Sequence, residues 1–92
     1  MIYETPYMRL KIHNDIVDWN DGTSIIHAKS IRRVSFDYKG PCIIVKTSQG
    51  EHYLHALSNY NMARDRKNAT KDLGNAFGWI YHVVQNYKGI RE

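Results

Sequence analysis

Residues 31–57 read IRRVSFDYKGPCIIVKTSQGEHYLHAL, and this stretch decides the fold. It contains three extended runs separated by two turn sequences: 31–38, 42–48 and 51–57. Glycine permits the backbone to reverse and proline fixes φ, so 39–41 and 49–50 are expected to be tight turns. The β-branched run at 42–48 begins with apolar residues at both odd and even positions, which predicts a central strand covered on both faces.

Alternation assigns faces to the outer two runs. In 31–38, Val34, Phe36 and Tyr38 share one parity and are expected to face the core. For the run 51–57 two alternatives are open. Either Tyr53, His55 and Leu57 point inward, or His52, Leu54 and Ala56 do.

The residues before this stretch predict three further strands. Met8, Leu10 and Ile12 alternate with polar residues, which is typical of a half-buried strand. A turn follows at 13–15, and a short strand is expected over 16–19. Asn20-Asp21-Gly22 tolerates positive φ and predicts a hairpin whose second strand lies within 23–28. Residues 1–7 show no period and are interpreted as an N-terminal arm.

The residues after it predict a helix. From Thr70 the apolar spacing changes to 3.6 residues, with one stripe formed by Leu73, Ala76, Phe77, Ile80, Val84 and Tyr87. Thr70 is the expected N-cap, and Gly89 marks the expected end, giving about 19 residues. Residues 58–69 are predicted to form either one short helical turn or an open loop.

Together these patterns predict an α+β fold in one domain, residues 8–92, behind the arm 1–7. About six short strands form a meandering, partly closed antiparallel sheet, capped by one C-terminal amphipathic helix. With 92 residues and 42% apolar composition, the chain is expected to hold a single core.

The stretch LKIHNDIVDWNDGTSIIHAKSIRRVSF (10–36), the later hairpin and the C-terminal helix resemble small bacterial pleckstrin-homology-like (PH-like) domains in element order. The resemblance covers roughly residues 8 to 88 and implies a bent sheet plugged by the last helix. It departs from the family in having six predicted strands where seven are usual. A second resemblance, through IRRVSF and IIVKTSQGEHYLHAL, is to LytTR-type DNA-binding domains, but their arginine-rich recognition segment has no counterpart here. Because PH-like folds host unrelated functions, the resemblance implies only a binding module and transfers no residue.

Composition excludes several classes of protein. The net charge is +4, and Cys42 is the only cysteine, so an internal disulfide is excluded and a reducing, cytoplasmic compartment is expected. The sequence has neither a signal-peptide pattern nor an apolar run long enough to span a membrane. Residues 58–92 carry six Lys and Arg against three Asp and Glu, so most of the positive excess lies there.

No pattern for catalysis or metal binding is found. His52 and His55 lie three apart on a predicted strand and therefore point to opposite faces. Cys42 opens an apolar strand, where burial raises a thiol pKa. No serine lies in the glycine-flanked turn that presents a hydrolase nucleophile, and the glycine spacing of a phosphate-binding loop is absent. The protein is therefore expected not to be an enzyme and to hold no metal or cofactor.

Trp79 carries the functional prediction. On a helical wheel it lies about 120° from the centre of the apolar stripe, beside a bare ridge formed by Gly74 and Gly78. Tryptophan and tyrosine are favoured interface anchors, so the predicted partner-binding residues are Trp79, Tyr81, Tyr3 and Tyr7. The expected function is a small non-catalytic interaction domain that binds another protein or itself. A phage-encoded or host accessory protein, acting as an inhibitor or adaptor, would fit this size.

The alternative is nucleic-acid or phosphate binding through the basic segment 64–71. Four cations lie in eight residues there, near the start of the predicted helix. Two cations on a predicted strand could extend the patch, so the alternative site comprises Arg64, Arg66, Lys67, Lys71, Arg32 and Arg33. Asp65 and Asp72 dilute its charge, and no aromatic residue is interleaved with the cations.

Overall fold

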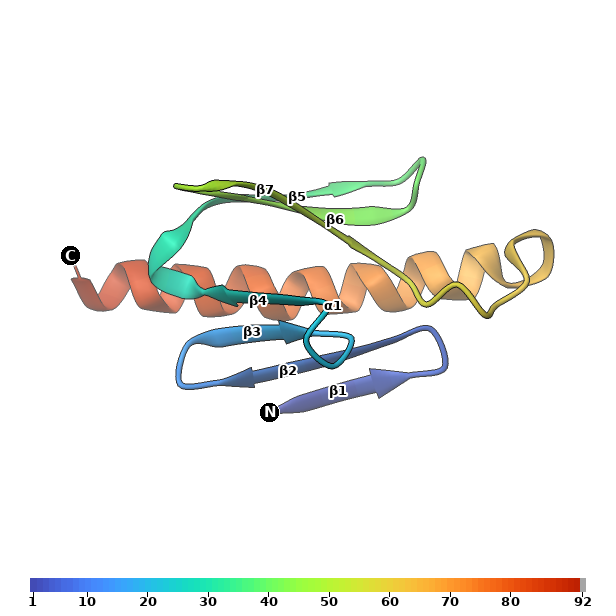
Figure 1. Ribbon diagram of the computed structural model, residues 1–92, viewed down its shortest axis with the longest axis horizontal. Coiled ribbons are helices and arrows are strands. Elements are labelled where there is room, and N and C mark those ends of the chain that lie inside the picture. The colour runs from blue at the N-terminus through green and yellow to red at the C-terminus, as the bar shows by residue number, and fades with distance from the viewer. Residues whose placement is uncertain (92) are drawn as a thin grey trace.

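The computed structural model describes residues 1–91, and the side chains of residues 1–87. Its elements in chain order are β1 (Ile2–Thr5), β2 (Met8–His13), β3 (Ile16–Trp19), β4 (Ser24–His27), the 3-10 helix η1 (Ala28–Ser30), β5 (Ile31–Asp37), β6 (Cys42–Thr47), β7 (Gly50–His55) and α1 (Met62–Arg91). Helix α1 runs along the long axis of the molecule, with β5 to β7 on one side of it and β1 to β3 on the other in the view of Figure 1.

The strands form two antiparallel sheets, one of four strands in the order β1-β2-β3-β4 and one of three in the order β5-β6-β7. The α+β class is thus confirmed, but the expectation of about six strands in one partly closed sheet is wrong. The division falls at η1. There the His27 ring accepts a hydrogen bond from the Lys29 backbone N–H (3.0 Å), and the Ser30 hydroxyl donates to the His27 carbonyl (2.8 Å). These bonds wind the backbone out of the extended conformation, so β4 ends and β5 starts a second sheet.

Residues 2–5, interpreted from the sequence as part of an arm, form the edge strand β1. The Met1 ammonium donates to the Ile12 carbonyl (2.7 Å), and the Ile12 N–H donates to the Met1 carbonyl (2.9 Å). Tyr3 lies opposite Leu10 in the β1–β2 register. Four residues followed by Pro6 are too few to show an alternating pattern, and the long-range partner supplies the order.

Both sheets turn an apolar face toward α1. The alternation predicted for β2 is confirmed, because Met8, Leu10 and Ile12 are buried. Hydrogen bonds tie the two sheets together at one end. The His55 carbonyl accepts from the Trp19 indole N–H (3.0 Å) and from the Asn20 side-chain NH₂ (3.2 Å), and the Leu57 N–H donates to the Tyr7 carbonyl (2.7 Å).

The three-stranded sheet resolves the open choice for the last strand. Leu54 is buried while Tyr53 is exposed, so the set containing Leu54 points inward. Strand β6 is central as predicted, but Ile44 on its outer face is only half-buried. Tyr38, expected in the core, is 74% exposed, because β5 ends at Asp37.

Helix α1 is 30 residues long and starts at Met62, eight residues before the predicted N-cap. Asn61 is the actual cap, since its side-chain oxygen accepts from the N–H groups of Ala63 (3.0 Å) and Arg64 (3.2 Å). The Asp65 carboxylate accepts from the Asn61 N–H (3.3 Å), so the two side chains cap reciprocally. Thr70 lies inside the helix, where its hydroxyl donates to the Arg66 carbonyl (2.7 Å).

The predicted apolar stripe is largely confirmed. Its buried members are Leu73, Ala76, Ile80 and Val84, and they are joined by Ala69 one turn earlier. Phe77 and Tyr87 are half-buried at the edges of the stripe.

Replacing the actual cap should cost stability. We expect Asn61→Ala to lower the free energy of unfolding by about 1 kcal/mol, because two N–H groups of the first helical turn lose their acceptor. Urea unfolding followed by circular dichroism measures this change. Thr70→Ala is the matched control and should have a smaller effect. A larger loss for Thr70→Ala would restore Thr70 as the start of the helix.

The hydrogen bonds of β1 predict an alternating pattern of amide exchange. Because Met1 and Ile12 exchange both bonds, Tyr3 and Thr5 also bond to β2, while the N–H groups of Ile2 and Glu4 point away from it. Hydrogen exchange followed by NMR should therefore be slow at Tyr3 and Thr5 and fast at Ile2 and Glu4. Uniformly fast exchange over these residues would mean that β1 is an unpaired arm in solution.

Candidate functional site

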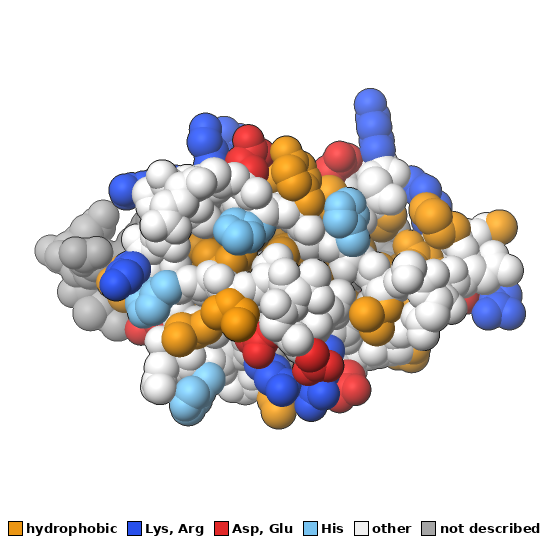
Figure 2. Space-filling model, in the orientation of Figure 1, with side chains coloured by type: hydrophobic (Ala, Val, Ile, Leu, Met, Phe, Trp, Pro, Cys, Tyr) orange, Lys and Arg blue, Asp and Glu red, His pale blue; other side chains and the backbone are white. Residues whose placement is uncertain are grey.

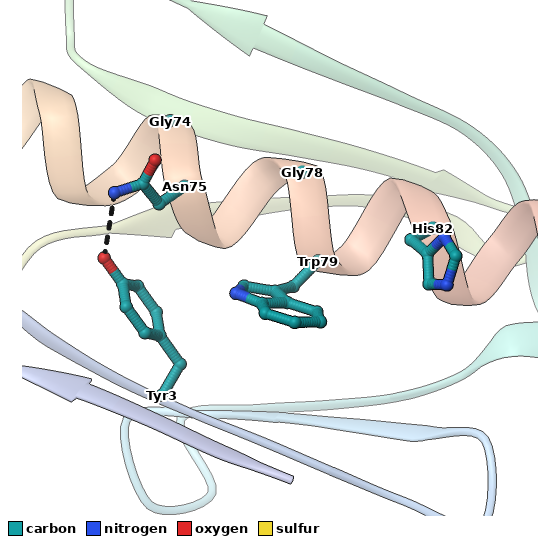
Figure 3. A pocket seen from close by; sticks show the side chains of 6 residues that line it. All are labelled: Tyr3, Gly74, Asn75, Gly78, Trp79 and His82. Atoms are coloured by element: carbon teal, nitrogen blue, oxygen red, sulfur yellow. Dashed lines mark hydrogen bonds between the residues drawn. The ribbon is translucent and has the colours of Figure 1, made fainter.

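A groove of about 480 Å³ lies between β1 and the exposed side of α1. Its lining residues are Tyr3, Gly74, Asn75, Gly78, Trp79 and His82. Five of the six come from three consecutive turns of α1, and Tyr3 comes from the opposite end of the chain. In Figure 3, Tyr3 and Trp79 lie on the same side of the helix with open space between them.

Helical spacing accounts for the shape of the groove. Gly74 and Gly78 are one turn apart, and a Cβ added to either would meet nothing within 4 Å outside the helix itself. The helix surface is therefore bare backbone at these two positions. Trp79 stands beside them with 44% of its surface exposed.

The walls of the groove are fixed by two polar contacts. The Asn75 side-chain NH₂ donates to the Tyr3 hydroxyl over 3.2 Å, which ties β1 to α1 across 72 positions of sequence (Figure 3). At the other end, Asn86 Nδ2 lies 3.1 Å from His82 Nε2, one turn further along the helix. Along α1, Trp79 lies between Asn75 and His82, which both line the groove.

The structure separates the four residues predicted to bind a partner. Trp79 lies off the core, as predicted, and it shares the groove with Tyr3. Tyr81 is 48% exposed but packs against Phe77, with ring centroids 6.0 Å apart, on the other flank of the helix. Tyr7 packs edge-on against Tyr60 at 5.5 Å. Neither Tyr81 nor Tyr7 lines the groove.

The binding site predicted from the sequence did not include Asn75 and His82. Both could have been found from helical spacing, because Asn75 lies four residues before Trp79 and His82 lies four after Gly78. Their contribution is polar, so the groove combines an indole, bare backbone and amide or imidazole groups that hydrogen bond.

The basic residues of the alternative site do not gather around one point. Arg64 pairs with Asp65 (Nε to Oδ1, 3.0 Å), and this hydrogen bond lowers the pKa of the Asp65 carboxyl. Arg66 donates to the Lys39 carbonyl. Lys67 and Lys71 are exposed on α1, whereas Arg32 and Arg33 are exposed on β5.

Arg33 belongs to a different surface from the basic helix residues. It lines a hollow of about 240 Å³ on the outer face of the three-stranded sheet, with Ser35, Ile44, Lys46 and Glu51. On the face seen in Figure 2, Lys and Arg side chains lie around the margin, and acidic side chains adjoin those along its lower edge. Ion pairs account for part of this mixture, as between Arg9 and Asp21 (3.3 Å).

The described residues offer little to a metal ion or a nucleophilic mechanism. No three His, Cys, Asp or Glu side chains within them cluster so as to hold a metal. The Cys42 thiol is buried, and burial, followed by the nearby Asp37 carboxylate, raises its pKa. A raised pKa leaves less thiolate at neutral pH.

This environment predicts slow alkylation of Cys42. At neutral pH, iodoacetamide should label the folded chain much more slowly than the chain unfolded in urea, because folding both buries the thiol and raises its pKa. Mass spectrometry of quenched samples measures both rates. Equal rates would show that the thiol is accessible in the folded chain, and only faster labelling of the folded chain would make Cys42 a candidate nucleophile.

No family model, curated protein or solved structure matches this chain. Within the described residues, no helix is both long and apolar enough to cross a membrane.

Proposed function

We propose that this protein is a non-catalytic binding module whose groove between β1 and α1 holds a partner polypeptide. The observation that carries the proposal is the exposed indole of Trp79 beside the bare backbone of Gly74 and Gly78. Bare backbone lets a partner approach closely, and the indole offers it a large, rigid apolar surface.

The magnitude of this contact supports the proposal. Tryptophan buries up to about 250 Å² in a protein interior, so covering its exposed part removes roughly 100 Å² of apolar surface from water. At about 25 cal/mol per Å² this contributes roughly 2.5 kcal/mol to binding. One anchor of that size is typical of the few residues that dominate an interface.

We further propose that the domain is PH-like. The support is the element order, with strands arranged in sheets of four and three and followed by one long helix. Strand β1 supplies the seventh strand that the sequence pattern lacked. Since such a fold serves as a scaffold for many binding sites, it is compatible with a module that works by occupying a partner.

The cellular setting belongs to the same proposal. A single buried thiol suits a reducing compartment, so we place the protein in the cytoplasm. An accessory protein, whether an inhibitor or an adaptor, needs no chemistry beyond this groove.

Binding of nucleic acid or phosphate through residues 64–71 has weaker support. Affinity for a phosphate backbone grows with the number of cations that are available to it. Arg64 is held by Asp65 and Arg66 by the Lys39 carbonyl, which leaves Lys67 and Lys71.

The proposal predicts that Trp79 determines affinity and that the chain still folds without its indole. Peptides selected from a displayed random library on the full chain should bind Trp79→Ala about thirtyfold more weakly, equivalent to about 2 kcal/mol. Isothermal titration measures the affinity. Thermal unfolding should show that the variant is still folded, with a moderately lower melting temperature, because the indole is more than half buried but lies outside the hydrophobic core of the described residues.

Tyr81→Ala is the matched control, since Tyr81 is similarly exposed at 48% but lies outside the groove. It should leave affinity unchanged. Sedimentation of the unliganded chain tests whether a second copy occupies the groove. The proposal fails if the library yields no binder, or if both variants weaken binding equally.

A further inference from the structure

The charges around the groove are distributed unevenly. Lys71 lies one helical turn before Gly74 and Asn75, and Lys67 lies one turn before Lys71. Both side chains are exposed, and neither forms an ion pair within the described part of the chain. Two unpaired ammonium groups therefore stand in a row at the end of the groove that is nearer to the start of α1.

Carboxylates are placed away from this row. At 100° per residue, Lys67 and Lys71 lie within about 20° of Gly78 around the helix, and His82 lies within about 40°. The nearest carboxylate on α1 among the described side chains, that of Asp72, lies about 120° from Gly78, on the Trp79 side of the groove. The two lysines therefore outnumber this one carboxylate along the groove, and they alone lie in line with Gly78.

The other wall of the groove does not cancel this charge. Glu4 follows Tyr3 on β1, but successive strand residues point to opposite faces of the sheet. The Glu4 carboxylate also lies 3.7 Å from Arg9 Nε. Tyr3 contributes a ring and a hydroxyl to the groove, and the nearby carboxylate faces the other side of the sheet.

We infer, on the basis of the function proposed above, that the occupant is an acidic segment of another protein. Its backbone lies against Gly74 and Gly78, one apolar side chain covers the Trp79 indole, and its carboxylates face Lys71 and Lys67. Charge complementarity of this kind speeds association and excludes partners of the wrong charge.

A second copy of the chain fits this surface poorly. Most of its described carboxylates already have partners. Asp21 pairs with Arg9 and Lys11. Asp18 accepts the Gly22 N–H, Asp37 the Lys39 N–H, Glu51 the Tyr53 hydroxyl, and Asp65 the Arg64 guanidinium. These contacts use part of the charge and acceptor capacity of each carboxylate, so less of it is available to Lys67 and Lys71 of another copy.

Nucleic acid also fits less well than an acidic polypeptide. Sequence-independent binding of single strands needs a groove lined by cations along the backbone path, with aromatic rings on which successive bases stack. Here two lysines lie at one end of the groove. Trp79 is flanked by Asn75 and His82, one helical turn to either side.

The experiment uses the full chain and a displayed library of random peptides. Selected peptides should be enriched in Asp and Glu next to one large apolar residue. Their affinity should fall about tenfold for the double variant Lys67→Glu/Lys71→Glu and should weaken as salt is raised with the wild-type chain. The salt titration needs no variant, so it tests the inference even where the double variant is destabilised.

The matched control is Arg33→Glu/Lys46→Glu, which changes the net charge by the same amount on the outer face of the three-stranded sheet. It should bind the selected peptides nearly as the wild type does. Thermal unfolding of both double variants verifies that they are folded.

The possible outcomes separate this inference from the proposed function. If uncharged or basic peptides are selected and depend on Trp79, the groove binds protein and the acidic occupant is wrong. Equal weakening by both double variants would also overturn the inference, because only net charge would then matter. If the library yields nothing while an oligothymidylate binds in a way that requires Trp79 and Lys71, the partner is nucleic acid and both proposals fail.

Discussion

The packing of α1 against the inner faces of the two sheets is the contact on which the rest of the structure depends. Leu73, Ala76, Ile80 and Val84 are buried along one side of this helix. Gly78 lies about 160° from Ile80 around the helix axis, so burying the stripe turns Gly74 and Gly78 toward solvent. The same contact that completes the core therefore creates the open groove.

The groove lies between two segments, β1 and α1, and each of them directs groups away from the rest of the fold. The edge strand β1 has N–H and C=O groups of Ile2 and Glu4 that point away from β2. Helix α1 carries the indole of Trp79, which lies outside the hydrophobic core of the described residues. The contact from Asn75 to Tyr3 brings both segments together in one place. A small domain buries relatively little apolar surface and has few large apolar side chains to spare, so an exposed tryptophan that lines a groove favours a binding role.

The sequence predicted elements wherever an apolar pattern or a turn sequence could be recognised. Alternation predicted β2 and β5, the β-branched run predicted β6, turn sequences predicted the short hairpin strands, and the 3.6-residue period predicted the stripe from Leu73 to Val84. Strand β1 was missed because its four residues show no period, and its order comes from pairing with β2. The first turns of α1 were missed because Asn61 caps them within a polar run in which Ala69 alone is buried.

The sequence by itself determined that Trp79 and the two glycines lie off the apolar stripe, since helical geometry places side chains by local spacing. Only the tertiary structure decided which tyrosine shares the site. Tyr3 meets Asn75 across 72 positions, while Tyr7 packs on Tyr60 and Tyr81 on Phe77. The reason is physical: neighbours within a helix are fixed by its repeat, whereas neighbours between elements depend on how the sheets and the helix pack to bury the core.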